Sequence, residues 1–281
     1  MRVVVTGVNG QLGYDVVKEL RKQGDEVIGL TRETLDLTEE DQVTKTIREI
    51  KPEAVIHCAA YTAVDLAEEE KDKALNVNTL ATSYLAKVCA EIQAKMIYIS
   101  TDYVFPGEGD KPYEVKDKVD PINWYGQTKY EGEQAVLREL NHYFIVRVTW
   151  VFGKNGNNFV KTMLRLSQER ESLSVVADQI GSPTYTVDLA KCLAEIVKTD
   201  KYGIYHVTNE GFCSWYDFAM EIFRMSGRNV VVHPLTSEQF PSKAKRPKNC
   251  RLSKQKLTEE GFERLPSWQD ALARYLEELK Q

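Results

Sequence analysis

The stretch that decides the fold is RVVVTGVNGQLG, at residues 2–13. Its β-branched first half predicts a strand, and apolar periodicity predicts a helix from Tyr14 to Gln23. Between the two lie Gly7, Gly10 and Gly13, spaced three apart. Residues without a Cβ let backbone amides approach a pyrophosphate closely, and the N-terminus of the next helix adds partial positive charge. The stretch therefore predicts a dinucleotide-binding turn.

Strands and helices continue to alternate as far as Val148. Short apolar runs predict further strands at residues 26–30, 54–59, 95–100 and 144–148. Helical patterns occur at residues 39–50, 75–93 and 125–140. Strands that lack polar alternation, each followed by a helix, indicate a parallel sheet covered on both faces. Beyond Thr149 the pattern weakens, with helices expected at 159–168, 187–198, 215–225 and from Ser267 onward.

This alternation predicts an α/β fold, with a doubly wound parallel sheet of the Rossmann type and a smaller C-terminal substrate-binding lobe. We assign residues 1–150 to an NAD(P)-binding domain and residues 151–281 mainly to the lobe. Residues 183–200 are expected to pack back on the first domain. Prolines in the linkers of the second half indicate a loop-rich lobe.

Composition excludes several classes of protein. The 281 residues are 42% hydrophobic and 28% charged, as in an ordinary globular protein, and the net charge of −5 argues against nucleic-acid binding. No apolar run is long enough for a membrane span or a secretory signal, so we expect a cytoplasmic protein. The five scattered cysteines predict reduced thiols, and the four histidines show no metal-ligand spacing, so no metal is assigned.

The end of the second predicted strand bears on the choice of cofactor. An acid there favours a free ribose 2′-hydroxyl, whereas an arginine accommodates a 2′-phosphate. The chain has Thr31 and Arg32 at this point, with Asp36 and Leu37 a little beyond. Arg32 favours NADPH and Asp36 suits a ribose or an adenine, so NADPH and NADH both stay open.

Tyr125 and Lys129 lie four residues apart, on one face of a predicted helix. The spacing alone proves little, because Tyr14 and Lys18 share it. Tyr125, however, follows a loop after the fourth predicted strand, which ends at Ser100–Tyr103. Ligands of doubly wound sheets collect beyond the carboxyl ends of the strands, so Tyr125 is the candidate for chemistry.

The chemistry explains why these residue types belong together. A free tyrosine has a pKa of about 10, and a nearby ammonium stabilises its phenolate. Lys129 is therefore expected to lower the pKa of Tyr125 toward the range of a general acid, and it can also hold the nicotinamide ribose. Thr101 would donate to the substrate oxygen or relay a proton toward it.

In this order the motifs resemble the dTDP-4-dehydrorhamnose reductases, a family of the extended short-chain dehydrogenase/reductase superfamily. The resemblance covers essentially the whole chain. Its later blocks are more specific than the glycine turn, because unrelated Rossmann enzymes lack them. The matching blocks are Ala59–Asp65, Ser100–Phe105, Trp150–Phe152, Gly156–Phe159, Asp178–Thr184 and Arg246–Leu252.

The resemblance implies NAD(P)H-dependent reduction of the 4-keto group of dTDP-4-dehydro-6-deoxy-L-mannose to dTDP-L-rhamnose. Tyr125 would be the proton donor, Lys129 its electrostatic partner and Thr101 a tuning or relaying group. The implied substrate contacts are Thr101, Asp102, Trp150, Asn158 and Arg246, the last two at the diphosphate. The implied cofactor contacts are Gly10, Gln11, Leu12, Ala60, Tyr61, Thr62 and Ile99, beside Gly7, Gly13, Tyr125 and Lys129.

Two other functions remain open. A nucleotide-sugar epimerase or dehydratase uses the same fold and Tyr/Lys pair, but dehydratases generally need an Asp-Glu pair beside the threonine, and here Asp102 is followed by Tyr103. A non-catalytic, NADP-binding regulatory subunit would have no reason to keep Thr101, Tyr125 and Lys129 together.

The chain departs from the family pattern at two points. The end of the second strand lacks the acid often present in relatives, and Cys250 stands where a serine is expected. Some relatives are dimers bridged by Mg²⁺ through acidic residues, and no such set is identified in this sequence, so monomer and homodimer both stay open. Trp150 and Asn158 also have structural interpretations, as a core residue and a turn residue. The acidic run Glu68–Glu70 is interpreted as a solvated helix face.

Overall fold

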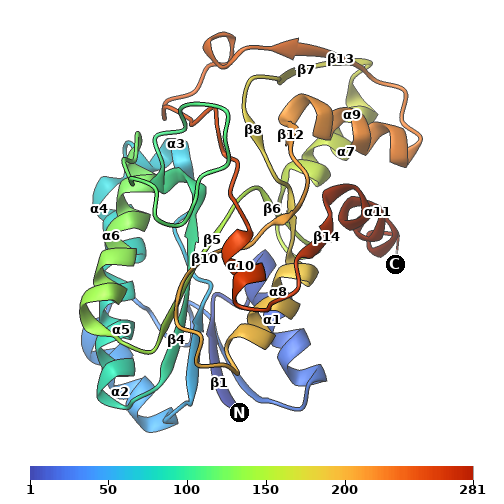
Figure 1. The fold of residues 1–281 in the computed structure, drawn as a ribbon. Helices are drawn as coiled ribbons and strands as arrows, with labels where there is room; N and C mark the ends of the chain where they lie inside the picture. The colour runs from blue at the N-terminus through green and yellow to red at the C-terminus, as the bar shows by residue number, and fades with distance from the viewer. Residues whose placement is uncertain (281) are drawn as a thin grey trace.

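The structure is a computed structural model that describes residues 1–280, and the statements below concern those residues. A parallel sheet forms its centre, in the strand order β2-β1-β3-β4-β5-β10 (Figure 1). The chain runs from β1 to β2 on one side and then crosses to β3 on the other, which makes a topological switch point between β1 and β3. The strands are β1 (Arg2–Thr6), β2 (Glu26–Leu30), β3 (Ala54–His57), β4 (Lys95–Thr101), β5 (Tyr143–Val148) and β10 (Gly203–His206).

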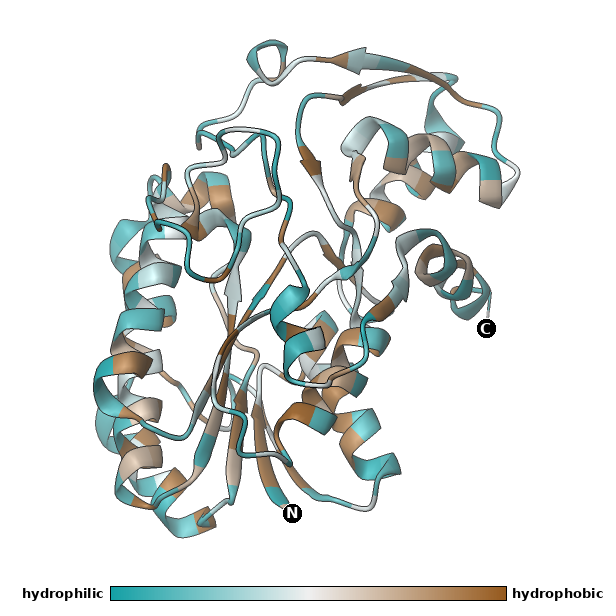
Figure 2. Ribbon diagram, viewed as in Figure 1, coloured by the Kyte–Doolittle hydropathy of each residue, from teal (hydrophilic) through white to brown (hydrophobic). Residues whose placement is uncertain are grey.

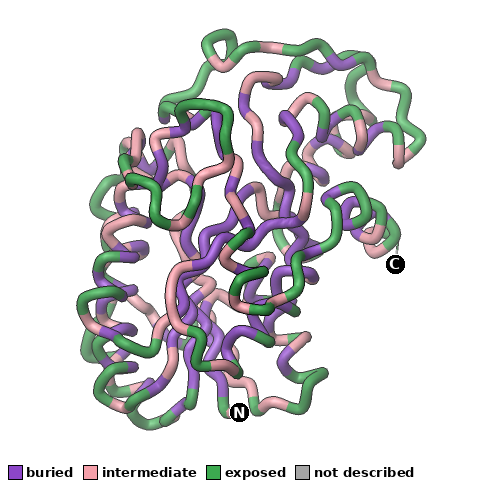
Figure 3. The backbone as a smooth tube through the Cα atoms, viewed as in Figure 1, coloured by how far each residue is buried: buried purple, intermediate pink, exposed green. Residues whose placement is uncertain are grey.

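Helices cover both faces of this sheet. Val3 and Val5 point into an apolar cluster with α1 and α8, whereas Val4 points into a second cluster with α2 and α5. The strands are therefore rich in apolar residues, and the inner strands are mostly buried, whereas the edge strand β2 is only partly buried (Figures 2 and 3). The helices of this half are α1 (Gln11–Lys22), α2 (Glu40–Ile50), α3 (Val64–Ala67), α4 (Lys71–Leu75), the π-helical turn η1 (Asn76–Leu80), α5 (Ala81–Glu91), the 3-10 turn η2 (Asp102–Val104), α6 (Trp124–Glu139), α8 (Thr186–Ile196) and α10 (Gln255–Glu259).

A smaller lobe lies at the carboxyl ends of the strands (Figure 1). Its core is rich in aromatic residues and joins α7, α9 and α11. Ser267 caps α11 as predicted, because its hydroxyl accepts from the Asp270 N–H. The elements of the lobe are β6 (Val151–Phe152), α7 (Phe159–Glu169), β7 (Ser172–Val176), β8 (Ile180–Gly181), β9 (Thr184–Tyr185), β11 (Asn209–Glu210), β12 (Cys213–Ser214), α9 (Trp215–Ser226), β13 (Val231–Leu235), the 3-10 turn η3 (Ser237–Gln239), β14 (Leu265–Ser267) and α11 (Trp268–Glu278).

The structure differs from the predicted elements in a few places. The first helix begins at Gln11 rather than Tyr14, and the helix predicted at 75–93 is interrupted by η1. Strand β10 was not predicted, because its four residues follow a charged turn and give no period of their own. With α8 packed on α1, β10 shows that the chain returns to the sheet after residue 185. The domain boundary at residue 150 stays a prediction.

Two further observations concern the described residues as a set. None of their helices combines the length and the apolar character that crossing a membrane requires. All five cysteines are free thiols, and four of them are buried, which confirms the prediction of reduced packing residues.

Candidate active site

The glycine turn after β1 approaches the end of β3. Gly7 has a φ of +69°, and a Cβ there would lie 2.7 Å from the backbone nitrogen of Ala59. A Cβ at Gly13 would collide with the Gly7 carbonyl. Gly10 is the N-cap of α1 and offers no side chain to cap it, and Leu12 turns inward into the core. The first turn of α1 therefore presents uncapped N–H groups to an anion, as a dinucleotide phosphate requires.

Gln11 connects this turn to the lobe. Its side-chain oxygen accepts from the Gly153 N–H at 3.0 Å and from Nδ2 of Asn158 at 2.9 Å. Nδ2 of Asn158 is also 2.9 Å from the Tyr275 hydroxyl, and its Oδ1 caps α7 by accepting from the Lys161 N–H. Asn158 thus acts as a helix cap and lobe contact in this structure. Its contact with a diphosphate stays a prediction, and it would require breaking these bonds.

Thr31, Arg32, Asp36 and Leu37 lie in the loop after β2. Thr31 closes a turn with Thr34, and Leu37 packs against the core at α2. Oδ1 of Asp36 accepts from the N–H and the hydroxyl of Thr38, at 3.0 and 2.7 Å, which lowers the pKa of Asp36. The side chain of Arg32 is exposed. An exposed guanidinium suits a 2′-phosphate, whereas Asp36 is already held within its own loop.

The loop after β3 holds Ala60, Tyr61 and Thr62, and it is fixed by a residue that the sequence analysis missed. Asn78 is buried in the π-helical turn η1. Its Oδ1 accepts from the Tyr61 N–H at 2.8 Å, and its Nδ2 donates to the hydroxyl of Thr128 in α6 at 3.0 Å. Asn78 therefore connects the β3 loop to the helix of Tyr125. A π-turn is often found at functional sites, but an apolar-periodic helix gives no sequence signal for one.

Thr101 and Tyr125 are brought together at the end of β4. The Thr101 hydroxyl donates to Oδ1 of Asp102 at 3.0 Å, accepts from the Tyr103 N–H and contacts the Tyr125 phenol. Tyr125 is the second residue of α6, and the Tyr103 ring meets its edge at 5.7 Å between centroids. Ile99, one of the predicted cofactor residues, is half-buried two residues before Thr101.

Lys129 lies one helical turn after Tyr125 and is 2% exposed. Its Nζ is 4.1 Å from the centroid of the Tyr98 ring and has no hydrogen-bond partner in the described part of the chain. Burial lowers the pKa of Lys129 to about 7, and the nearby carboxylate of Glu133 opposes this shift. A lysine without a partner in this position is partly neutral at pH 7.

The expected acidification of Tyr125 by Lys129 is wrong for this structure. Burial raises the pKa of Tyr125 above its ordinary value, the contact with Thr101 opposes the rise, and Lys129 is not among the groups that shift it. The physical reason is desolvation, which penalises the phenolate more than a partly neutral lysine can compensate. A phenol with a raised pKa stays protonated at neutral pH, which is the form that a proton donor needs.

These surroundings fit a nicotinamide dinucleotide. The glycine turn admits a close approach, α1 has an uncapped N-terminus, and the buried Nζ of Lys129 needs an acceptor. A ribose hydroxyl is an acceptor of the right kind for that ammonium. The three features come from three separate elements, and all of them adjoin the switch point.

Cys250 lies between Asp102 and Trp150. Its thiol contacts the Asp102 carboxyl and the indole of Trp150. Trp150 has a φ of +46°, an unfavourable value for a bulky residue, and its ring stacks on Trp215 at 3.7 Å between centroids. Its strained backbone and partial exposure favour the predicted substrate contact over a plain core position.

Residues 242–246, here called the crossing segment, bring Arg246 to the same region. The guanidinium of Arg246 pairs with Oδ2 of Asp65 at 2.7 Å and contacts the Tyr103 hydroxyl at 3.4 Å. Oδ1 of Asp65 accepts from the Ala244 N–H, and Nδ2 of Asn123 donates to the Lys245 carbonyl at 2.8 Å. The crossing segment is thus tied both to α3 and to the first turn of α6.

Comparisons with known proteins identify the family. A family model described as RmlD substrate binding domain matches residues 1–281. The dTDP-4-dehydrorhamnose reductase of Aggregatibacter actinomycetemcomitans is 42% identical, covering 96% of this chain and 97% of its own. The spore coat polysaccharide biosynthesis protein SpsK of Bacillus subtilis is 40% identical, covering 99% and 97%. The crystal structure of dTDP-4-dehydrorhamnose reductase from Bacillus anthracis in complex with NADP has a TM-score of 0.96 at 46% identity, covering 99% of each chain. The chain belongs to the dTDP-4-dehydrorhamnose reductase family.

Membership of the reductase family confirms the resemblance and the doubly wound α/β fold predicted from the sequence. The interpretation of Glu68–Glu70 as a solvated helix face is right in that Glu69 and Glu70 are exposed, but the run lies in a turn after α3, and each carboxylate also has a partner. Glu68 accepts from the Trp124 N–H at 2.8 Å, Glu69 pairs with Lys243, and Glu70 accepts from the Tyr61 hydroxyl at 2.6 Å. These acids hold the β3 loop, the start of α6 and the crossing segment. A run of like charges gives no sign of partners that are distant in sequence.

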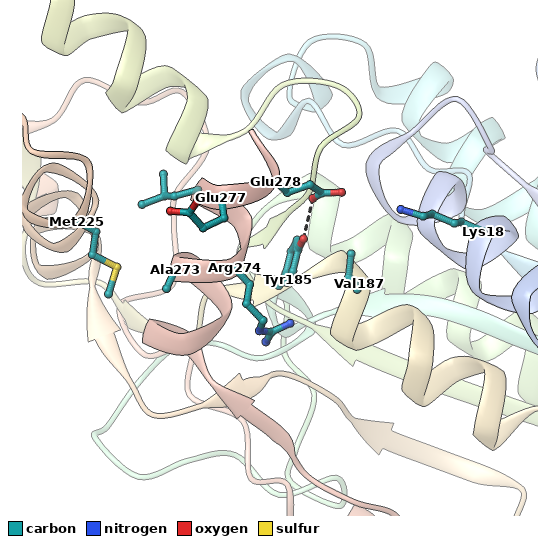
Figure 4. Close-up of a pocket in the computed structure, with 9 residues that line it drawn as sticks. Lys18, Tyr185, Val187, Met225, Ala273, Arg274, Glu277 and Glu278 are labelled. Atoms are coloured by element: carbon teal, nitrogen blue, oxygen red, sulfur yellow. Dashed lines mark hydrogen bonds between the residues drawn. The ribbon is translucent and has the colours of Figure 1, made fainter. Parts of the chain in front are cut away.

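A groove of about 670 Å³ lies elsewhere, between α1, α8, α9 and α11 (Figure 4). Lys18, Arg274 and Glu278 line it, and the Tyr185 hydroxyl donates to Glu278 at 2.7 Å. None of the predicted site residues of the reductase family lines this groove. Within residues 1–280 no cluster of three or more His, Cys, Asp or Glu side chains is arranged to hold a metal ion.

Proposed function

We propose that this chain is an NAD(P)H-dependent oxidoreductase that reduces the 4-keto group of dTDP-4-dehydro-6-deoxy-L-mannose, giving dTDP-L-rhamnose. The observation that carries the proposal is the convergence of Thr101, Tyr125 and Lys129 at the carboxyl ends of the strands. The full-length match to the dTDP-4-dehydrorhamnose reductases supports it, as does the NADP complex of the Bacillus anthracis relative. The likeness to SpsK supports a place in polysaccharide biosynthesis.

Each side chain has a task that its surroundings allow. NADPH or NADH, when bound, supplies the hydride for the carbonyl carbon. Tyr125, kept protonated by burial, donates a proton to the carbonyl oxygen as negative charge develops there. Lys129 binds the nicotinamide ribose through its buried Nζ. Trp150 contacts the sugar, and Arg246 binds the diphosphate, which a guanidinium recognises well.

The two alternatives fit the site less well. Tyr103 follows Asp102 and packs its ring on Tyr125, so the acid pair of a dehydratase is missing beside Thr101. A regulatory subunit has no need for a proton donor next to a buried lysine. We also propose a dTDP-sugar as the substrate, a cytoplasmic location, and a monomer or homodimer.

An absorbance assay tests the proposal. Protein mixed with NADPH or NADH and the 4-keto sugar nucleotide should oxidise the cofactor in step with the reduction of the substrate. Tyr125→Phe should lower kcat by roughly 10²- to 10⁴-fold while the cofactor still binds, since only the proton is removed. Tyr14→Phe is the matched control, because Tyr14 has the same spacing to its lysine but is exposed, and it should retain full activity. No consumption by the wild type, or an active Tyr125→Phe, would contradict the proposal.

A further inference from the structure

Asp102 is a buried carboxyl to which the mechanism above gives no task. It follows Thr101 directly, and 3% of it is exposed. Oδ1 accepts from the Thr101 hydroxyl at 3.0 Å, whereas Oδ2 is buried with no hydrogen-bond partner among residues 1–280. A buried carboxylate with an unsatisfied oxygen is costly, and a proton on the carboxyl removes most of that cost. The expected contact between Asp102 and the sugar nucleotide stays a prediction.

We propose that Asp102 stores a proton and returns it to Tyr125 through the Thr101 hydroxyl, after Tyr125 has protonated the substrate. The polar groups form a continuous path, because the Tyr125 phenol contacts Thr101, and Thr101 is 3.0 Å from the carboxyl. The proposal rests on the proposed reductase function and deepens it. Asp102 acts through Thr101, so it is a positioning and relay residue, not a catalytic one.

The transfer balances without any further reactant. When Tyr125 gives its proton to the substrate oxygen, it becomes a phenolate. The Thr101 O–H bond then breaks and a new O–H bond forms on Tyr125. For this, the Thr101 hydroxyl turns from Asp102 to the phenolate, and the carboxylic acid carries its proton on Oδ1, the oxygen that faces Thr101. The Oδ1–H bond breaks at the same time, and this proton replaces the one that Thr101 lost. The net result is a carboxylate at Asp102, which takes a proton from water once the product leaves.

The surroundings of Asp102 favour this direction of transfer. Burial raises the pKa of Asp102 to about 7, and contacts with Cys250 and Thr101 oppose the rise. The titratable groups that face the carboxyl are the thiol of Cys250 and the phenols of Tyr103 and Tyr125, all neutral at pH 7. A carboxylic acid gives its proton readily to a phenolate whose pKa is raised, so the relay runs downhill from Asp102 to Tyr125.

Cys250 stabilises the carboxylate form of Asp102, but only weakly. Its backbone N–H donates to the Ile180 carbonyl at 2.7 Å, which fixes the thiol beside Asp102. A thiol is a weak hydrogen-bond donor, so it stabilises the carboxylate less than the hydroxyl of a serine would. The departure from the family pattern at residue 250 therefore bears directly on where Asp102 titrates.

The test compares wild type and Asp102→Asn at saturating NADPH and sugar nucleotide across pH 5 to 9. The wild-type kcat should fall as pH rises through about 7, because Asp102 must begin each turnover protonated. Asp102→Asn keeps the shape of the side chain but has no carboxylic acid proton to give to Thr101. Its kcat should be lower by roughly tenfold or more, without the alkaline fall and with an unchanged KM for the sugar nucleotide. An alkaline fall that persists in Asp102→Asn would overturn the proposal, as would a raised KM with normal kcat.

Two further measurements do not depend on the activity of Asp102→Asn. Cys250→Ser should move the alkaline fall to lower pH, because a hydroxyl stabilises the carboxylate; an unmoved profile contradicts the relay. Infrared spectroscopy of the protein should show a carboxylic acid C=O band below pH 7 that disappears on titration and is missing in Asp102→Asn. Absence of this band in wild type overturns the proposal even if the reductase assay succeeds. A protein with the band but no NADPH consumption supports the stored proton and contradicts the proposed function instead.

Discussion

The side-chain nitrogen of Lys129 is buried where residues 1–280 provide no hydrogen-bond partner for it. Its Nζ meets the face of the Tyr98 ring, and neither Glu133 nor Cys58 makes a hydrogen bond to it. The consequence is a pKa of about 7 in the free protein. A ligand that offers an acceptor to this ammonium would return the pKa toward its ordinary value of about 10.5, and binding would then be linked to proton uptake.

This linkage gives a prediction with a definite sign. The bound state holds more protons than the free state between the two pKa values, so the protein should take up about one proton per NADPH bound at pH 8. The affinity for NADPH should accordingly fall as pH rises above 7. Calorimetric titration in two buffers of different ionisation enthalpy measures the uptake. Lys129→Met should bind more weakly and take up no proton at any pH, and equal uptake by both proteins would exclude Lys129 as the linked group.

The first turn of α6 is the element that gathers the site. Asn123 caps it, since Oδ1 accepts from the Gly126 N–H at 2.8 Å, and its Nδ2 donates to the Lys245 carbonyl of the crossing segment. Glu68 adds a second anchor at the Trp124 N–H. Tyr125 is therefore positioned by a helix start whose orphan N–H groups are met by side chains from distant parts of the chain.

Substitutions can test the capping oxygen and the donor nitrogen of the Asn123 side chain separately. Asn123→Ala removes both bonds and should lower the free energy of unfolding by about 1 kcal/mol, the usual value of an N-cap. Asn123→Asp keeps the capping oxygen but loses the donor to Lys245, so stability should largely recover. If the crossing segment helps Arg246 to bind the diphosphate, the KM for the sugar nucleotide should stay raised in both variants. Urea unfolding and steady-state kinetics measure the two effects, and a normal KM in Asn123→Asp would contradict this role of the segment.

At the scale of the whole molecule, local sequence patterns predict most of the central sheet and its helices. They do not predict the contacts between segments that are far apart in the sequence. Strands of β-branched residues followed by amphipathic helices were sufficient to predict β1 to β5 and the helices that cover them. The same local patterns pointed to Gly7, Tyr125 and Lys129, because each sits at a predictable end of an element. β10, the partners of Glu68–Glu70 and the bonds of Asn78 could not be predicted, since each depends on contacts between residues far apart in the chain.

The pKa of Tyr125 also depends on features that local sequence patterns do not reveal. Spacing in a helix predicted that Lys129 lies near Tyr125, and it does lie one turn away. The direction of the pKa shift depends on how much water reaches the phenol, and burial of Tyr125 is a property of the assembled fold. The sequence predicts which residues form such a site, whereas their pKa values depend on the elements that surround them in the fold.

The switch point offers a test of how closely β1 and β3 must approach. Gly7 and Gly24 both have positive φ, at +69° and +83°, but a Cβ at Gly24 would meet open space, whereas one at Gly7 would meet the backbone of Ala59. Gly24→Ala should therefore cost only the backbone strain, about 1 kcal/mol of unfolding free energy. Gly7→Ala carries the same strain and must also push the glycine turn away from β3, so it should cost clearly more and abolish NADPH binding. Urea unfolding and fluorescence titration with NADPH distinguish the variants. Equal losses of stability with NADPH binding intact would show that the close contact between the two strand ends does not shape the cofactor site.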